Sequence, residues 1–226
     1  MSGLAEYCPA FQGAGAQITP NSIDRYEIYQ IIAPMIGTDV MGTAEGTSTQ
    51  AVTGAFNQVL ADYPRSYTVS IVGESGSTTG GTFTLTGKDQ FGNVLSENFA
   101  KTVAVNGGTV AGTKVFAQFT SFLGTIGTTN AGVGTALLIP SVTGTTALFG
   151  LPTKIAGSAD VRSMSFGSTG VPKAVNGGTI GAFVNVAQNA IKAPNTITTA
   201  TANLSWINVW YKPSWDNSQK TKLTGL

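Results

Sequence analysis

The chain has 226 residues, of which 42% are hydrophobic and only 10% are charged, and its net charge is +1. The hydrophobic content is sufficient for a folded core and excludes a disordered chain, whereas ordinary soluble domains carry about a quarter charged residues. In place of charges the chain has 29 glycines and many threonines. Threonine suits the solvent face of a sheet without adding charge. We therefore expect a surface that repels neighbouring molecules weakly, as in a dense assembly.

Several function classes are disfavoured at once. The basic residues are scattered singly, without a basic stripe, so we expect no nucleic-acid partner. The start MSGLAEYCPAF has neither a basic nor an apolar signal region, and no run has the length of a membrane span, so we expect a protein made in a cytoplasm with no membrane contact. Cys8 is the only cysteine, which excludes an internal disulfide.

Residues 1–66 differ in pattern from the rest and are predicted to form an extended, partly helical N-terminal arm. Pro20-Asn21-Ser22 can begin a short helix, although Tyr29–Ile32 fits a strand equally well. Met41–Gln50 is rich in Gly, Thr and Ser and is expected to be an exposed loop, and Ala51–Tyr63 has helical spacing of its apolar residues. An arm that orders on binding should be removable, so deletion of residues 2–40 is expected to leave a folded core.

From Ser66 the hydrophobic period changes to two, the period of a half-buried strand. Many short alternating segments separated by Gly-rich turns predict an all-β, antiparallel β-sandwich or jelly-roll-like domain over residues 67–212. Residues 213–226 are predicted to be a polar tail. The expected strands include Tyr67–Val72, Thr102–Val105, Thr109–Val115, Ala136–Pro140, a segment through Ile155, Val161–Phe166, Ala182–Val186 and Leu204–Tyr211.

The clearest hairpin lies at Gly81–Ala100. Phe83 and Leu85 fall on one face and Thr82, Thr84 and Thr86 on the other. Phe91-Gly92-Asn93 then supplies a turn, because Gly and Asn tolerate positive φ.

Catalytic chemistry is scarce. The absence of histidine removes Ser-His-Asp and Cys-His constellations and His-ligated zinc. Between Tyr67 and Lys212 the carboxylates are Glu74, Asp89, Glu97 and Asp160, each expected to be a solvated loop or strand-end residue. Asp89 and Asn93 are expected to form an Asx-type turn rather than a calcium site. We predict no catalytic, cofactor-binding or metal-binding residues and a non-enzymatic protein.

Aromatic residues near the two ends are the candidates for partner binding. In the segment LSWINVWY, Trp206, Asn208 and Trp210 lie on one face of an expected strand. The tryptophans can line a core, a subunit interface or a sugar-binding face. The full candidate set comprises Tyr7, Phe11, Tyr26, Tyr29, Trp206, Trp210 and Trp215.

The order of several motifs resembles a known group. An alternating strand leads into Thr86-Gly-Lys-Asp-Gln-Phe-Gly-Asn93 and Val94–Glu97, followed later by Gly112–Thr120 and Phe149–Pro152. This order resembles β-sandwich virion structural proteins of tailed bacteriophages, although Asp-Gln-Phe-Gly-Asn turns also occur in bacterial Ig-like repeats. The resemblance spans about Tyr67–Ile155 and carries over no catalytic residue.

The resemblance implies a capsid-associated protein located in the virion. The expected function is that of a decoration (cement) protein that stabilises the shell, with the major capsid protein and copies of itself, for example in a trimer, as partners. The alternatives are another virion component, such as a jelly-roll capsid, tail or connector protein, and an Ig-like adhesin or carbohydrate-binding module.

Overall fold

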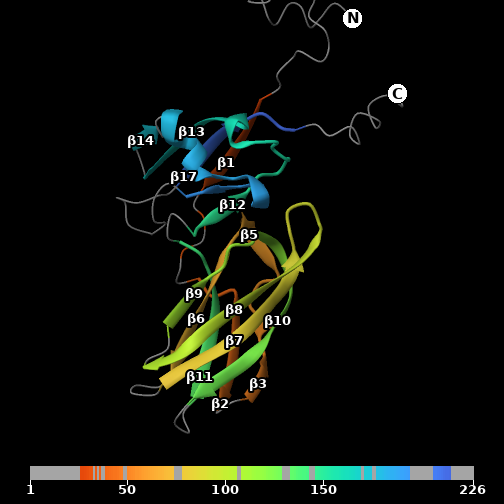
Figure 1. Ribbon diagram of the computed structural model, residues 1–226, viewed down its shortest axis with the longest axis vertical. Coiled ribbons are helices and arrows are strands. Elements are labelled where there is room, and N and C mark those ends of the chain that lie inside the picture. The colour runs from red at the N-terminus through yellow and green to blue at the C-terminus, as the bar shows by residue number, and fades with distance from the viewer. Residues whose placement is uncertain are drawn as a thin grey trace, which may run out of the picture.

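The computed structural model describes residues 26–32, 34, 36, 39–47, 50–73, 78–105, 108–128, 133–142, 146–168, 171–174, 177–193 and 206–214. These residues form two lobes stacked along the long axis of the molecule (Figure 1). The sandwich lobe comprises β2 to β11, and the cap lobe comprises β1 and β12 to β17. Every strand pairing is antiparallel, which confirms the predicted all-β, antiparallel class.

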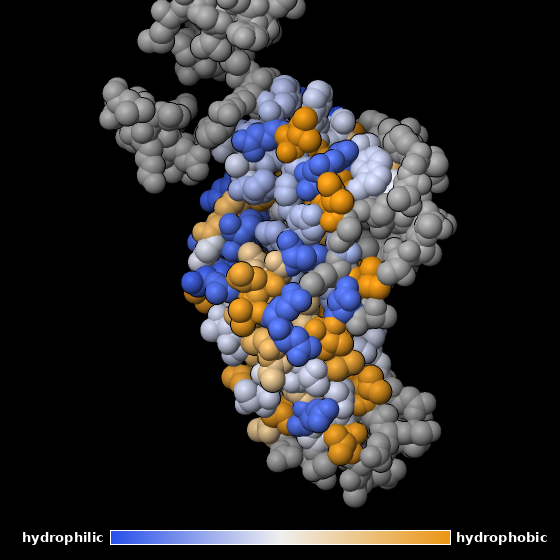
Figure 2. Space-filling view, turned by 180° about the vertical axis from the view of Figure 1, so that it is seen from behind, coloured by the Kyte–Doolittle hydropathy of each residue, from blue (hydrophilic) through white to orange (hydrophobic). Residues whose placement is uncertain are grey.

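The surface carries apolar side chains among polar ones. On the face seen in Figure 2, hydrophobic residues reach the surface at several places along the molecule, with hydrophilic residues between them. Among the described residues, no helix combines the length and apolar character needed to span a membrane. The well-exposed large hydrophobic residues are Tyr26, Ile28, Ile32, Val59, Leu60, Val72, Val94, Leu123, Val133, Val186 and Trp210.

The sandwich lobe packs two sheets face to face. One is five-stranded, in the order β4-β2-β11-β6-β9, and the other is the β5-β10-β7-β8 part of an eight-stranded sheet, with β3 also paired to β10. The bounds are β2 Gly42–Thr47, β3 Gln50–Thr53, β4 Ala55–Phe56, β5 Leu60–Arg65, β6 Tyr67–Gly73, β7 Thr78–Lys88, β8 Val94–Val105, β9 Gly108–Ala111, β10 Phe116–Thr128 and β11 Val133–Pro140.

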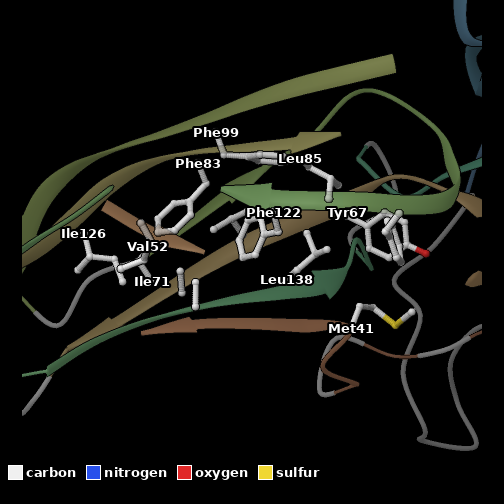
Figure 3. Packing of buried hydrophobic residues seen from close by; sticks show 14 of the residues in the cluster. Met41, Val52, Tyr67, Ile71, Phe83, Leu85, Phe99, Phe122, Ile126 and Leu138 are labelled. Carbon is white, nitrogen blue, oxygen red and sulfur yellow. The ribbon is translucent and has the colours of Figure 1, made fainter. Parts of the chain in front are cut away.

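The predicted hairpin is the β7–β8 pair, in which Phe83 lies opposite Phe99. Phe83 and Leu85 point into the core, where Phe83 stacks on Phe122 with ring centroids 5.1 Å apart (Figure 3). The threonines point outward, as the alternation predicts, and Thr84 Oγ1 donates a hydrogen bond to Asn98 Oδ1 at 2.8 Å. Gly92 has φ +82°, which explains a glycine in the turn.

The cap lobe contains a four-stranded sheet in the order β1-β17-β13-β14 and the short strands β12, β16 and β15 that end the eight-stranded sheet. Its core collects residues far apart in sequence, from Ile31 to Tyr211. The bounds are β1 Glu27–Ile32, β12 Leu148–Gly150, β13 Val161–Ser168, β14 Val171–Ala174, β15 Val184–Asn185, β16 Ala190–Lys192 and β17 Trp206–Tyr211, with 3-10 helices η2 Ser158–Asp160, η3 Gly177–Phe183 and η4 Val186–Gln188.

The two lobes share one continuous sheet at Arg65. This residue pairs with Phe116 of β10 on one side and with Phe149 of β12 on the other. Its guanidinium is buried, forms a salt bridge to Asp62 (Nη1 to Oδ2, 3.1 Å) and lies 4.8 Å from the Phe149 ring centroid. Burial lowers the pKa of Arg65, and the neighbouring Asp62 opposes that shift. Removal of this side chain would therefore disturb both lobes.

Residues before position 66 depart from the predicted helical arm. The expected helix over Ala51–Tyr63 is wrong, because β3, β4 and β5 occupy that stretch, and the expected loop over Met41–Gln50 is wrong, because it contains β2. The physical reason is tertiary packing. Val52 and Ala44 are buried in the sandwich core, and this burial outweighs the local secondary-structure propensity of the two segments. The boundary at residue 66 does not separate two sets of strands, since β1, β2, β3 and β5 all pair with strands beyond it.

Other predictions near the start and in the cap lobe have mixed outcomes. The strand reading of Tyr29–Ile32 is confirmed by β1, whereas most of the alternative helix at Pro20-Asn21-Ser22 lies outside the described residues. The segment ending at Ile155 has no strand after Gly150, and Ala182–Val186 is mostly 3-10 helix with only Val184–Asn185 as a strand. The C-terminal tail beyond Ser214 lies outside the described residues.

Candidate partner-binding face

The strongest candidate site is the outer face of the four-stranded sheet, which we call the tryptophan face and define by Ile28, Ile32, Trp206, Asn208 and Trp210. The β1–β17 register places Ile28 opposite Trp210 and Ile32 opposite Trp206. Directly opposite residues of an antiparallel pair point to the same side of the sheet, so these side chains share one surface. Ile28 is 66% exposed, Ile32 55% and Trp210 50%.

The alternation of the two strands explains why this face is left outside. The intervening residues Ile31, Ile207, Val209 and Tyr211 are all 0% exposed and fill the cap core. A shift of one residue in the register would expose that set, and burial of the inner set therefore fixes which side chains face solvent. Burial of the inner residues specifies the register strongly. The side chains of the tryptophan face are therefore held in fixed positions on the outer side of the sheet.

A small polar network anchors the inner side of the same strands. Tyr211 donates a hydrogen bond to Glu27 Oε2 at 2.9 Å, and Thr153 Oγ1 also donates to Glu27 Oε2 at 2.8 Å. Burial, opposed by the Thr153 hydroxyl and reinforced by the adjacent Glu27, raises the pKa of Tyr211 to about 12. This network fixes the paired ends of β1 and β17.

The paired positions of the tryptophan face carry no charged side chain. Gln30 lies opposite Asn208, and on the other side of β17 the residues opposite Trp210 and Asn208 are Ser163 and Ser165. A cation lies at the flank of this face, where the Arg162 guanidinium is 6.0 Å from the ring centroid of Tyr26. A surface of this kind can be desolvated by a partner without the cost of burying an ion.

Strand β1 is an edge strand, and edge strands present backbone groups that another chain can pair with. One end of this edge is already occupied. The Tyr63 hydroxyl accepts a hydrogen bond from the Ile32 N–H and donates one to the Ile32 carbonyl, both at 3.0 Å. A partner is therefore expected on the face rather than along this end of the edge.

The structure brings three of the predicted partner-binding residues together. Trp206 and Trp210 lie on the tryptophan face, and Tyr26 immediately precedes β1. Tyr29 lies on the opposite side, packed against the cap core, where burial and then the neighbouring Tyr63 and Asp62 raise its pKa. The remaining predicted residues, Tyr7, Phe11 and Trp215, lie outside the described residues.

Ile28 and Ile32 are the residues of this face that sequence reasoning missed. The period-two pattern of EIYQII places them together with Gln30 on the side that Tyr26 begins. That signal was present, but the choice between helix and strand for this stretch was open. Only the pairing with β17 decides it.

Asp89 and Asp160 accept hydrogen bonds from backbone N–H groups. Asp89 Oδ1 accepts from the N–H groups of Phe91 and Asn93 at 2.8 Å, which confirms the Asx-type turn. Asp160 Oδ2 accepts from the N–H groups of Ala156 and Gly157. Glu74 lies outside the described residues.

Glu97 corrects the expectation of a solvated carboxylate. It is buried, and its oxygens accept hydrogen bonds from the N–H groups of Thr113 and Lys114. This interaction ties β8 to the segment that leads into β10. In the described ranges, no group of three or more Cys, His, Asp or Glu side chains is arranged to hold a metal ion.

Comparison with known proteins gives little further information. No protein-family model matches the chain, and no curated protein matches it. Among solved structures, the chain is similar to that described as a subviral particle of infectious bursal disease virus VP2, with 13% sequence identity and a TM-score of 0.23. The match covers 92% of this chain and 48% of that one, so this chain spans about half its length. Such a TM-score does not establish a shared fold.

Proposed function

We propose that this chain is a non-enzymatic structural protein of a virus particle, and more specifically a decoration (cement) protein of a tailed bacteriophage. In this proposal it binds the major capsid protein and copies of itself and stabilises the shell. The observation that carries the proposal is the tryptophan face, an exposed, uncharged and rigid apolar surface. Tryptophan is among the residues that contribute most to protein interfaces.

Two further features support this proposal. With 10% charged residues and a net charge of +1, neighbouring copies would repel one another weakly. The second feature is the outer side of the β7–β8 hairpin, which is lined by threonine and asparagine hydroxyl and amide groups that suit close contact with a neighbour. The sequence resemblance to phage virion proteins over about Tyr67–Ile155 points in the same direction.

The position of β1 determines how much of the N-terminal segment can be removed without the loss of a described strand. Deletion of residues 2–40 would remove β1 and with it Ile31 of the cap core, so we expect this truncation to destabilise the cap lobe. Deletion of residues 2–25 leaves every described strand intact. We expect that shorter truncation to fold and to bind shells less tightly, because the removed residues would no longer contribute contact area.

Co-sedimentation of the purified protein with shells of the major capsid protein tests the proposal. Trp210→Asp should weaken binding at least about tenfold, since a charge would replace a central interface aromatic. Val72→Asp is the matched control, because Val72 is 46% exposed and lies on β6 in the five-stranded sheet of the sandwich lobe, away from the tryptophan face and from the outer side of the β7–β8 hairpin. Equal binding by both variants and the unsubstituted protein would contradict the role of this face.

One observation favours a second candidate function. Trp206 and Trp210 present aromatic surface on one face with the Asn208 amide between them, a combination that can stack on and hydrogen-bond to a sugar. A glycan array probed with the intact protein distinguishes the two functions. Specific glycan binding that is lost in Trp210→Ala would favour the carbohydrate-binding module, and no signal on the array would argue against it.

A further inference from the structure

A cavity of about 400 Å³ opens at the junction of the two lobes, away from the tryptophan face. Its sandwich-lobe wall is the β7–β8 turn with the segment before β10, and its cap-lobe wall is the loop after β12 with η4. This volume falls within the range of small-ligand pockets, about 300–1,000 Å³. The lining residues that matter for the argument are Phe91, Leu95, Lys114, Lys154, Ile155 and Asn189.

Both walls are fixed by hydrogen bonds. On the cap side, Asn189 Oδ1 accepts from the Ile155 N–H at 2.8 Å, and Asn189 Nδ2 donates to the carbonyls of Leu151 and Thr153. On the sandwich side, the Asp89 carboxylate holds the turn together. Gln90 Nε2 reaches across the junction to the Asn189 carbonyl at 3.4 Å. The cavity is therefore formed before any ligand arrives, which lowers the entropic cost of binding.

The charge lining the cavity is positive. Lys114 and Lys154 come from opposite walls, and among the described residues neither has a carboxylate within salt-bridge distance. Lys154 Nζ lies 5.6 Å from the Phe91 ring centroid, and Lys114 Nζ donates one hydrogen bond to the Ser96 carbonyl. Each ammonium group has three donors, so both retain donors for a ligand.

The carboxylates near the cavity form their hydrogen bonds with groups other than the two lysine ammonium groups. Asp89 lines the cavity, but its oxygens accept from the N–H groups of Phe91 and Asn93 and from Asn93 Nδ2. The oxygens of Glu97 face the backbone of Thr113 and Lys114. The ammonium groups of Lys114 and Lys154 therefore keep N–H donors that are available to an anion in the cavity.

We propose that this cavity binds a small ligand that carries a carboxylate or phosphate group. The anionic group would lie between Lys114 and Lys154, whose ammonium groups form charge-assisted hydrogen bonds. The uncharged part of the ligand would contact Leu95, Phe91 and Ile155. Because the ligand touches both lobes, binding should stabilise their junction and raise the Tm of the protein.

The test uses the full chain at constant ionic strength and three probes, namely citrate, inorganic phosphate and a capped tetraglutamate peptide. Binding is followed by calorimetry and by the Tm. Saturable binding of at least one probe is expected, and Lys114→Gln and Lys154→Gln should each weaken it about tenfold. Lys88→Gln is the control: it removes the same charge from an exposed lysine that does not line the cavity.

The probes identify the source of the anion. Preference for citrate indicates a carboxylate ligand and preference for phosphate indicates a phosphate-bearing ligand, whereas preference for the peptide indicates acidic side chains of another protein and would contradict a small ligand. The proposal is overturned if none of the probes binds saturably. It is equally overturned if Lys88→Gln weakens binding as much as the two cavity variants, because the effect would then be one of net charge alone.

Discussion

Asn189 organises the cap-lobe wall of the junction, and its replacement tests how that wall is held. The residue is 9% exposed and has φ +48°, the left-handed region that few non-glycine residues adopt. Its side chain makes three hydrogen bonds to backbone groups, namely the Ile155 N–H and the carbonyls of Leu151 and Thr153. The perturbation is a pair of variants, Asn189→Gly and Asn189→Ala.

The two variants separate hydrogen bonding from backbone strain. Asn189→Gly keeps the left-handed backbone but removes all three side-chain hydrogen bonds, each of which contributes about 1 kcal/mol net, so we expect a loss of about 3 kcal/mol. Asn189→Ala loses the same bonds but keeps a Cβ at positive φ, which costs about 1 kcal/mol relative to glycine. The alanine variant should therefore be about 1 kcal/mol less stable than the glycine variant.

Urea unfolding followed by tryptophan fluorescence is the appropriate assay, because Trp206 and Trp210 lie on β17 and report on the cap lobe. Far-ultraviolet circular dichroism reports on both lobes in the same samples. A loss below about 1 kcal/mol for Asn189→Gly would refute the hydrogen-bond reasoning. Equal unfolding free energies for the two variants would refute the contribution of backbone strain.

Two other substitutions test the packing and the polar network. Gly124→Ala should destabilise the protein by more than about 2 kcal/mol, because the added Cβ would lie 2.3 Å from the Thr82 carbonyl oxygen. Gly92→Ala should cost about 1 kcal/mol, because Gly92 has open space around it but a φ of +82°. Urea unfolding measures both losses, and a larger loss for Gly92→Ala than for Gly124→Ala would contradict the packing argument. Tyr211 keeps its proton more tightly when folded, so its contribution to the free energy of unfolding is full below pH 10 and is lost as the pH rises toward about 12. Tyr211→Phe should make the stability less sensitive to pH in that window, and an unchanged pH profile would show that Tyr211 does not titrate there.

The sequence predicted best where local period and burial agree. The alternation in Gly81–Ala100 gave the β7–β8 hairpin and its buried side, and LSWINVWY gave the two faces of β17. In both stretches one set of alternate residues is apolar and buried, so local pattern and tertiary environment lead to the same structure.

Prediction failed where a strand depends on a distant partner. The segment containing β2 is rich in glycine and threonine and lacks a local strand signal, yet it pairs with β11, about 90 residues later, and places Ala44 opposite Ala136. Helical spacing in Ala51–Tyr63 is likewise overridden, because Phe56 stacks on Phe119 with ring centroids 5.4 Å apart. Contacts of this range leave no trace in a local window.

For the candidate sites too, the parts set by local alternation could be predicted and the parts set by long-range contacts could not. The aromatic residues of the tryptophan face were found from alternation, but its completion by Ile28 and Ile32 required the pairing of β1 with β17, two strands near opposite ends of the chain. The cavity could not have been found, since Lys114 and Lys154 belong to different lobes and nothing local marks Asn189 as the residue that holds the wall.

The central claim is that the chain acts by being held against neighbouring subunits in a particle. A cryo-electron microscopy reconstruction of virus particles from the natural source of the chain tests it most directly. The account predicts many symmetry-related copies on the outside of the head, with Trp210 and Ile28 buried against a neighbouring subunit. Particles that lack the chain, or copies whose tryptophan face is fully open to solvent, would contradict it.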